Sequence, residues 1–276
     1  MTAVDTFAGS RPPRENRLRR ALATTGRTTR ARLSFTLVAA ALAFGVVREA
    51  FRPAAWRRPV RLEFARTLRS AIAGGLGITT IAAALIGIIM IYQALFWLEE
   101  AGQEGLIGGI LVTVLLREVT PLLVGFVVLG RSGANTAAEI GALQLGGEVE
   151  RVAAQGIDPF LLLILPRAVA LAVACYTLGV VFMLVAMAVG LAVADLGRGV
   201  LLSTWQFFAT VLGAMQPRDF AIFPAKMVVI GLLIAVTSAL SGLMVRPDEA
   251  ANLLPRSFVR GVLAIMISSL TLSLAV

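Results

Sequence analysis

Hydrophobic residues run in five long stretches after an arginine-rich first quarter of the chain. Each stretch holds about 20 residues or more, the length that an α-helix needs to cross the hydrocarbon core of a bilayer. Charged residues, prolines and glycines gather in the segments between them. The pattern therefore predicts an all-α polytopic membrane protein with five transmembrane helices, at residues 71–98, 106–130, 160–194, 220–245 and 257–276.

A further apolar stretch, residues 33–47, is shorter than a spanning helix needs to be. Arginines lie on both sides of it, so spanning would place one basic cluster outside the cell. We expect a cytoplasmic interfacial helix along the membrane surface, with a true span as the alternative. The chain then divides into a flexible basic segment (1–32), an interfacial or elbow region (33–69) and a transmembrane domain (70–276).

The segments between the spans differ in charge and length. Residues 99–105 carry three acidic and no basic residues, which is typical of an outer loop. Residues 131–158 form the longest inner segment, long enough for a helix between two turns. Residues 195–219 form the second outer link, where Trp205 and two nearby phenylalanines predict a helix resting at the membrane interface.

The first span carries small residues at four-residue spacing. The pairs are Ser70/Gly74, Ala71/Gly75, Ala73/Gly77 and Ala83/Gly87. Such faces let helix backbones approach closely in lipid, so they favour packing of this helix against a neighbour.

Composition and charge agree with a membrane location and fix an orientation. Hydrophobic residues make up 58% of the chain and the mean hydropathy is +0.87. Eight arginines lie between positions 11 and 32 and seven between 48 and 69, within a net charge of +9. The positive-inside rule places this end in the cytoplasm, and five spans then place the C-terminus outside. Nucleic acid is a poorer partner for these arginines, because they are not interleaved with aromatic residues.

The residue inventory excludes several kinds of chemistry. With no histidine, catalysis by imidazole and metal sites built on it are excluded. Cys175 is the one cysteine, and its apolar surroundings indicate a buried structural thiol. Lys226 is the one lysine and follows an alanine, so the chain holds no G-x-x-x-x-G-K phosphate loop. We expect no cofactor and no metal site, and any ATP hydrolysis must belong to another subunit.

Arg117 and Glu118 stand out inside the second span. Arg117 lies about 16 Å from the start of that span, near the bilayer midplane. A charge there costs about 2.5–3.5 kcal/mol and must face protein or water. A cavity-lining role and a structural inter-helix pair are both open, and Pro121 frees a backbone carbonyl beside them. Arg167 and Lys226 each lie about 10 Å inside a helix end, and we expect them to extend to the headgroups.

Several short motifs follow in a fixed order: Leu-Arg-Glu at 116–118, Gly-Arg-Ser-Gly at 130–133, Ala-Glu-Ile-Gly at 138–141, Gly-Ile-Asp-Pro at 156–159 and Pro-Arg at 166–167. Their order and spacing, on this hydropathy profile, resemble the MlaE/YrbE permease family over residues 61–276. These permeases are the membrane subunits of ABC transporters that work with MCE-domain proteins in lipid trafficking.

The resemblance implies that residues 131–158 form the segment that couples the permease to its ATPase. The contact residues that it implies are Arg131, Glu139, Gly141, Glu148, Glu150 and Arg151. A plain connecting loop is the alternative. Residues 143–149 depart from the family, reading Leu-Gln-Leu-Gly-Gly-Glu-Val where relatives usually carry Met and a Glu-Gln pair. Two adjacent glycines weaken a helix by about 1 kcal/mol each.

The resemblance also implies a function. We expect a homodimeric permease of the cell inner membrane that moves phospholipid or another hydrophobic molecule to or from a periplasmic MCE assembly. Its partners would be an ABC ATPase, the MCE protein, a STAS-domain accessory subunit and membrane lipids. Arg117 and Glu118 would line its substrate chamber. A membrane-embedded scaffold is the second hypothesis; an intramembrane enzyme is poorly supported, because the spans hold no catalytic motif.

Overall fold

The computed structural model describes residues 17–100, 102, 107–198 and 204–274. The chain divides into two compact units, residues 1–41 and residues 42–276. The first holds the larger part of helix α1 (Arg17–Ala50), which begins inside the basic segment for which the sequence predicts no regular structure. Residues 33–47 are therefore helical, and their position on the membrane surface stays a prediction.

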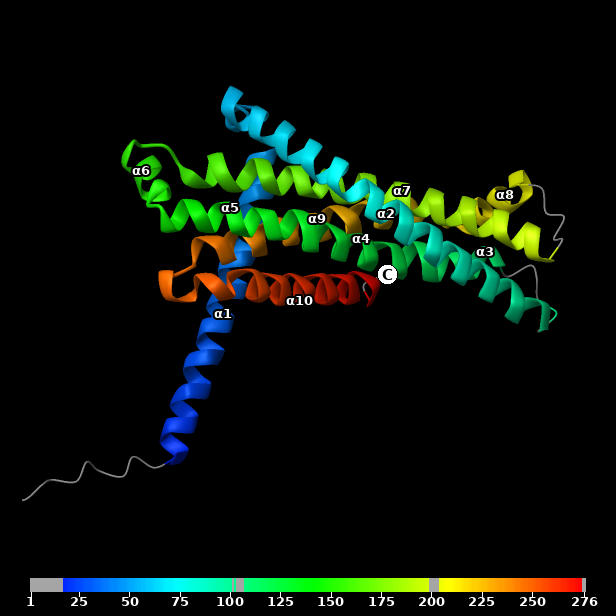
Figure 1. Ribbon diagram of the computed structural model, residues 1–276, viewed down its shortest axis with the longest axis horizontal. Coiled ribbons are helices and arrows are strands. Elements are labelled where there is room, and N and C mark those ends of the chain that lie inside the picture. Colours follow the sequence, from blue (N-terminus) through cyan, green and yellow to red (C-terminus); the bar gives the residue numbers. More distant parts are fainter. Residues whose placement is uncertain (1–16, 101, 103–106, 199–203, 275–276) are drawn as a thin grey trace, which may run out of the picture. The chain divides into compact units, whose positions relative to one another are not determined.

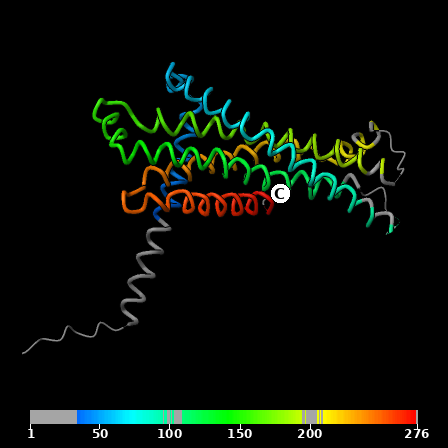
Figure 2. The backbone as a smooth tube through the Cα atoms, viewed as in Figure 1, coloured from blue at the N-terminus to red at the C-terminus, as the bar shows by residue number. Residues whose placement is uncertain are grey.

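Five long helical segments run side by side in the second unit (Figures 1 and 2). They are α2 (Arg58–Glu100), the run from α3 (Ile107–Ile110) to α5 (Ala134–Leu145), η5 (Phe160–Ile164) with α7 (Leu165–Arg198), α9 (Pro217–Leu243) and α10 (Leu253–Leu274). Each contains a stretch long and apolar enough to cross a membrane, and five such helices exist in the described ranges. The five transmembrane helices expected from the sequence are confirmed, in a chain whose described regular elements are all helical.

The second long segment continues further than expected. The sequence predicts that the span ends at Gly130, but the helix itself does not end at that residue. The helix continues through η3 (Leu111–Val119), α4 (Thr120–Val128) and η4 (Leu129–Gly133) into α5; η3 and η4 are π-helical. Residues 134–145 are mostly good helix formers, and the burial of Ala137 and Ile140 stabilises the extension.

Two glycines end this extension. Helix α5 stops at Gly146, and Gly147 has a φ of 71°, in the left-handed region that glycine adopts without steric cost. The Gly146–Gly147 pair therefore separates two helices, rather than weakening the interior of one as the sequence predicts.

Short helices close the two ends of the bundle. Helix α6 (Glu148–Ala154) and the 3₁₀ turn η6 (Pro247–Asn252) lie at one end, and α8 (Thr204–Ala214) lies at the other (Figure 1). Helix α8 falls within residues 195–219, where the sequence predicts a helix, and its Trp205 is exposed. Most of the acidic link at residues 99–105 lies outside the described residues.

Helix α2 packs against α7 through small residues. Between residues 71 and 91 its buried positions recur every four residues: Ala71, Gly75, Thr79, Ala83, Gly87 and Ile91. A Cβ atom at Gly87 would clash with the backbone of Ala186, so the two backbones meet directly there. This confirms the close packing expected at the Ala83/Gly87 pair. Gly77 faces open space, so the Ala73/Gly77 pair takes no part in the contact.

We expect Gly87→Leu to destabilise the protein strongly, because a backbone cannot rotate away from the new side chain. Overpacking costs about 1–3 kcal/mol, and more where the backbone must move. The melting temperature of the purified protein in detergent should fall clearly. Gly77→Leu is the matched control, since it places the same side chain in open space on the same helix. Equal melting temperatures for the two variants would contradict this contact.

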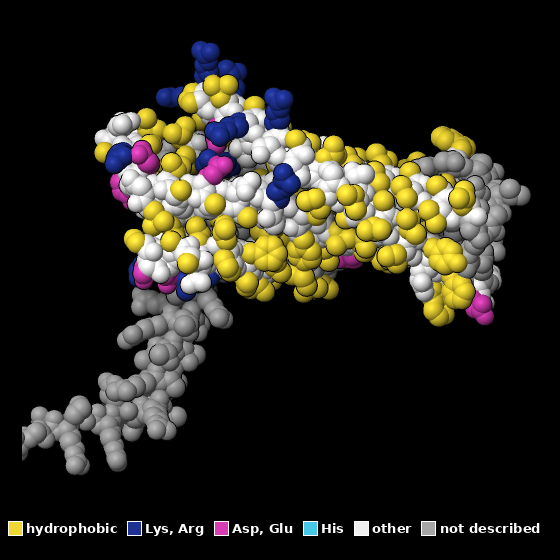
Figure 3. Space-filling view, in the orientation of Figure 1, with side chains coloured by type: hydrophobic (Ala, Val, Ile, Leu, Met, Phe, Trp, Pro, Cys, Tyr) yellow, Lys and Arg dark blue, Asp and Glu magenta, His cyan; other side chains and the backbone are white. Residues whose placement is uncertain are grey.

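The surface separates into apolar and charged zones. Figure 3 shows hydrophobic side chains along the length of the bundle and charged side chains gathered at the end that carries α6. Helices α2 and α10 contribute many large exposed apolar side chains, among them Leu76, Ile81, Leu85, Ile89, Val259, Leu263, Ile267 and Leu270. Apolar surface of this extent is covered by lipid or by partner proteins.

Candidate functional site: two ion pairs inside the transmembrane helices

Arg117, on the π-helical segment η3, forms an ion pair with Asp219 in the first turn of α9. Its Nε and Nη2 atoms lie 2.8 and 2.7 Å from Oδ1 of Asp219. Asp219 is 1% exposed, and its Oδ2 accepts the backbone N–H of Gln216 at 2.9 Å in the N-terminal cap of α9. The carboxylate is thus held both by the helix terminus and by the guanidinium.

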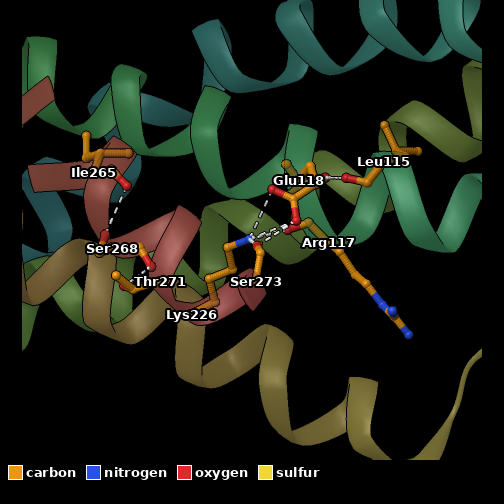
Figure 4. Close-up of polar contacts among 9 residues, drawn as sticks. Leu115, Arg117, Glu118, Lys226, Ile265, Ser268, Thr271 and Ser273 are labelled. Carbon is orange, nitrogen blue, oxygen red and sulfur yellow. Dashed lines mark hydrogen bonds and ion pairs between the residues drawn. The ribbon is translucent and has the colours of Figure 1, made fainter. Parts of the chain in front are cut away.

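Glu118, the next residue, pairs with Lys226 on α9. Both carboxylate oxygens lie 3.4 Å from the Nζ atom of Lys226. The hydroxyl of Ser273, in the last turn of α10, donates to Oε1 of Glu118 at 2.6 Å and accepts from Lys226 at 2.8 Å. Figure 4 shows the ammonium group between the carboxylate and the serine. Three helical segments therefore meet at this lysine.

Pro121 explains a further contact of Lys226. Proline has no N–H, so the carbonyl of Arg117, four residues earlier, loses its ordinary α-helical donor. Nζ of Lys226 donates to this carbonyl at 2.5 Å (Figure 4). The neighbouring Leu115 carbonyl is satisfied within the segment by the N–H and hydroxyl of Thr120. The carbonyl expected to be freed beside the charged pair is thus bound by the one lysine of the chain.

The structure brings together residues that the sequence treats separately. Lys226 is 2% exposed and engaged with three partners, so the expectation that it extends to the headgroups is wrong. Arg117 and Glu118 form inter-helix pairs, yet their side chains remain 25% and 45% exposed. The structural and the cavity-facing interpretations are therefore compatible. Asp219 is not identified from the sequence; the available signal is an acidic residue at the third position of a helix that begins with a proline.

Helix α6 carries three of the coupling candidates, and Arg131 and Glu139, outside α6, are exposed as well. Glu148, Glu150 and Arg151 are all exposed. Glu150 accepts a hydrogen bond from Gln144 at 2.7 Å across the Gly146–Gly147 turn, and Arg151 pairs with Glu148 one turn away. The two glutamates also lie in the first turn of α6, where a negative charge complements the helix dipole.

The other coupling candidates make contacts within the bundle. Gly141 is buried, and a Cβ atom there would lie 2.6 Å from Leu253. Glu139 lies 3.1 Å from Arg167 of α7, and Glu63 of α2 lies 2.8 Å from the same guanidinium. Arg167 is 6% exposed, so these two glutamates hold its side chain inside the bundle, rather than the side chain extending along the bundle surface as expected. These three charged residues connect α2, α5 and α7.

The arrangement of the four central charges is suited to binding rather than to bond breaking. Arg117, Glu118, Asp219 and Lys226 form two neutral pairs, which lowers the cost of holding charge between apolar helices. The partly exposed guanidinium can donate to a phosphate oxygen, and the partly exposed carboxylate can accept from an ammonium or a hydroxyl group.

One family model and several known proteins match the chain. The family model "Permease MlaE" matches residues 64–275. Over 163 residues the chain is 28% identical to Protein TRIGALACTOSYLDIACYLGLYCEROL 1, chloroplastic, of Arabidopsis thaliana, a match that covers 59% of this chain and 46% of that protein. It is 28% identical to a probable ABC transporter permease protein of Rickettsia prowazekii, over 56% of this chain and 60% of that protein.

A probable ABC transporter permease protein of Synechocystis is likewise 28% identical, over 72% of this chain and 75% of its own length. The chain thus matches about half of the plant relative and three-fifths of the Rickettsia one. The family match covers all five membrane-spanning helices apart from the first turns of α2. This chain belongs to the MlaE permease family.

Proposed function

We propose that the protein is the permease subunit of an ABC transporter that moves phospholipid or a related hydrophobic molecule between the inner membrane and a periplasmic MCE-protein assembly. Membership of a permease family and the ABC transporter names of the bacterial relatives support the transporter class. The name of the plant relative refers to a galactosyl diacylglycerol, which supports a lipid cargo.

The observation that carries the proposal is the pair of ion pairs centred on Arg117 and Glu118. Charges inside apolar helices are costly, and where they remain partly accessible they mark a path for a polar group. Arg117 and Glu118 keep exposed surface although Asp219 and Lys226 hold them. We place the headgroup of the cargo against these two side chains, with the acyl chains along the neighbouring apolar helix faces.

ATP hydrolysis belongs in this proposal to a separate ATPase that docks on α6 and the adjoining end of α5. The surface offers two glutamates and one arginine at the end of the bundle where charged side chains gather (Figure 3). A homodimer would present two such surfaces to two ATPase subunits. The experiment is co-purification of the permease with its partners, followed by mass spectrometry of the bound lipid.

We expect charge reversal at both Glu148 and Glu150 to weaken binding of the co-purified ATPase, because docking surfaces depend on complementary charge. A loss of about tenfold in affinity corresponds to about 1.4 kcal/mol, within the usual range for such contacts. Titration of the ATPase onto immobilised permease measures this. Glu100→Lys is the control, because Glu100 is the last residue of α2 and lies at the end of the bundle away from α6. Unchanged affinity of the ATPase for the double variant would show that the ATPase docks on another surface.

We expect the C-terminus to lie on the outer side, because five spans follow an arginine-rich cytoplasmic segment. A phosphatase reporter fused after Val276 should be active in the periplasm, and the same reporter fused before Met1 should be inactive. An inactive C-terminal fusion, with normal expression, would mean that the segment at residues 33–47 crosses the membrane.

A further inference from the structure

A polar cavity lies between α2, α5 and α7, away from the Arg117 cluster. Its volume is about 110 Å³, room for several water molecules and so for a group the size of a phosphate. Three arginines line it: Arg66, Arg131 and Arg167. Hydroxyl and amide side chains from α2, η4 and α5 complete the lining, together with two glutamates.

The charges in this cavity do not balance. Arg167 is neutralised by Glu63 and Glu139, which lie 2.8 and 3.1 Å from its Nη2 atom. No carboxylate of the described residues lies within ion-pair distance of Arg66 or Arg131. The three arginines and two glutamates that line the cavity give it a net charge of one positive unit. An anion is the complementary occupant.

Gly74 makes room for one of these arginines. A Cβ atom at position 74 would clash with Nε of Arg131 and would lie 2.9 Å from its Cζ atom. The guanidinium of Arg131 therefore lies directly against the backbone of α2, and Ser70 lines the same cavity one turn earlier on that helix. A planar guanidinium beside hydroxyl donors is the arrangement that recognises phosphate oxygens.

The position along α2 indicates where the anion comes from. The α2 residues that line the cavity fall between positions 63 and 71, within the first four turns of that helix, where its sequence changes from arginine-rich to apolar. This change is typical of the level of the lipid headgroups. A cation pocket at that level meets phosphodiester groups at high local concentration.

We propose that this cavity binds a phosphate or phosphodiester group, with Arg66 and Arg131 as its ligands, and that the headgroup of a phospholipid in the adjacent leaflet supplies it. Arg131 then acts on lipid rather than on the ATPase. The site is separate from the Arg117 cluster, and binding to it needs neither the ATPase nor transport, so it can fail while the proposed transport function stands.

A cysteine placed in the cavity reports its occupancy directly. Cys175 is fully buried, so Ser70→Cys adds the one exposed thiol of the described chain. The full-length variant in maltoside micelles, which carry no phosphate, is treated with a neutral maleimide. We expect dioctanoyl phosphatidylglycerol to slow labelling about tenfold near saturation, and dioctanoylglycerol, which has no phosphate, to leave labelling unchanged. Inorganic phosphate is the third probe. Protection by inorganic phosphate at the same concentrations would identify free phosphate as the occupant of the cavity, and protection by the phospholipid alone would identify the lipid headgroup.

Charge removal tests the ligands. In the Ser70→Cys background, Arg131→Gln or Arg66→Gln should raise the lipid concentration for half-protection about tenfold, since each removes a charged hydrogen-bond donor. Arg69→Gln, on the same helix but outside the cavity lining, should leave it unchanged. Arg131→Lys, which keeps the charge, controls for misfolding. Undiminished protection in both glutamine variants, equal protection by dioctanoylglycerol, or no protection by either phosphate compound would overturn the proposal.

Discussion

Glu118→Ala is expected to lower the stability of the protein more than removal of its partner Lys226. The ammonium group of Lys226 is almost fully buried, whereas the Glu118 side chain is 45% exposed. Losing the carboxylate leaves a buried charge without compensation, which costs about 3 kcal/mol. Losing the lysine leaves a carboxylate that water can reach and an unpaired Arg117 carbonyl, which costs about 1–2 kcal/mol. Melting temperatures in detergent measure both effects.

A double variant separates the charge from the packing. Glu118→Gln with Lys226→Met removes the buried charge together with its partner, so most of the stability should return. The carbonyl of Arg117 still lacks a donor because of Pro121, so about 1 kcal/mol of the loss should remain. Additive losses in the double variant would show that the two side chains do not interact.

Arg117→Ala is expected to reduce lipid transport while leaving the assembled protein largely intact. Its partner Asp219 still accepts the N–H of Gln216 and still lies at the positive end of the α9 dipole. These two interactions partly offset the stability lost with the ion pair. Transport should fall about tenfold or more, which corresponds to a barrier raised by about 1.4 kcal/mol at the position we assign to the headgroup. Lipid exchange between donor and acceptor vesicles measures the rate.

The conservative variant Arg117→Lys tests whether charge alone is enough. A lysine cannot reproduce the planar donor pair that contacts Asp219 and a phosphate oxygen together, so we expect transport between that of wild type and Arg117→Ala. Wild-type transport in Arg117→Ala would remove this side chain from the lipid path.

The hydrophobic pattern predicts most of the fold. The five spans follow from length and apolar composition, and the Ala83/Gly87 contact follows from the spacing of small residues. The length of the second helix is missed because residues 131–158 are polar and contain glycines, so the sequence predicts a separate helix between two turns. Residues 134–145 instead continue the second helix and pack through Ala137 and Ile140. Pattern rules locate a membrane boundary, and a helix can extend far beyond it.

The candidate site is predicted only in part. Arg117 and Glu118 stand out because their surroundings in the sequence are apolar, and Pro121 indicates a free carbonyl. Their partners Asp219 and Lys226 lie about a hundred residues away on α9, and sequence spacing does not show that these residues meet. The usual rule that a lysine near a helix end reaches the headgroups then gives the wrong prediction for Lys226.

The central claim is that the Arg117 cluster serves lipid transport, and flux per assembled complex tests it most directly. Complex yield and lipid flux are measured on one reconstituted preparation of wild type, Arg117→Ala and the Glu118→Gln/Lys226→Met double variant. The account predicts complex yields near that of wild type, with flux per complex reduced about tenfold in both variants. Wild-type flux per complex in both variants, at whatever yield, would contradict the claim and assign these charges to folding alone.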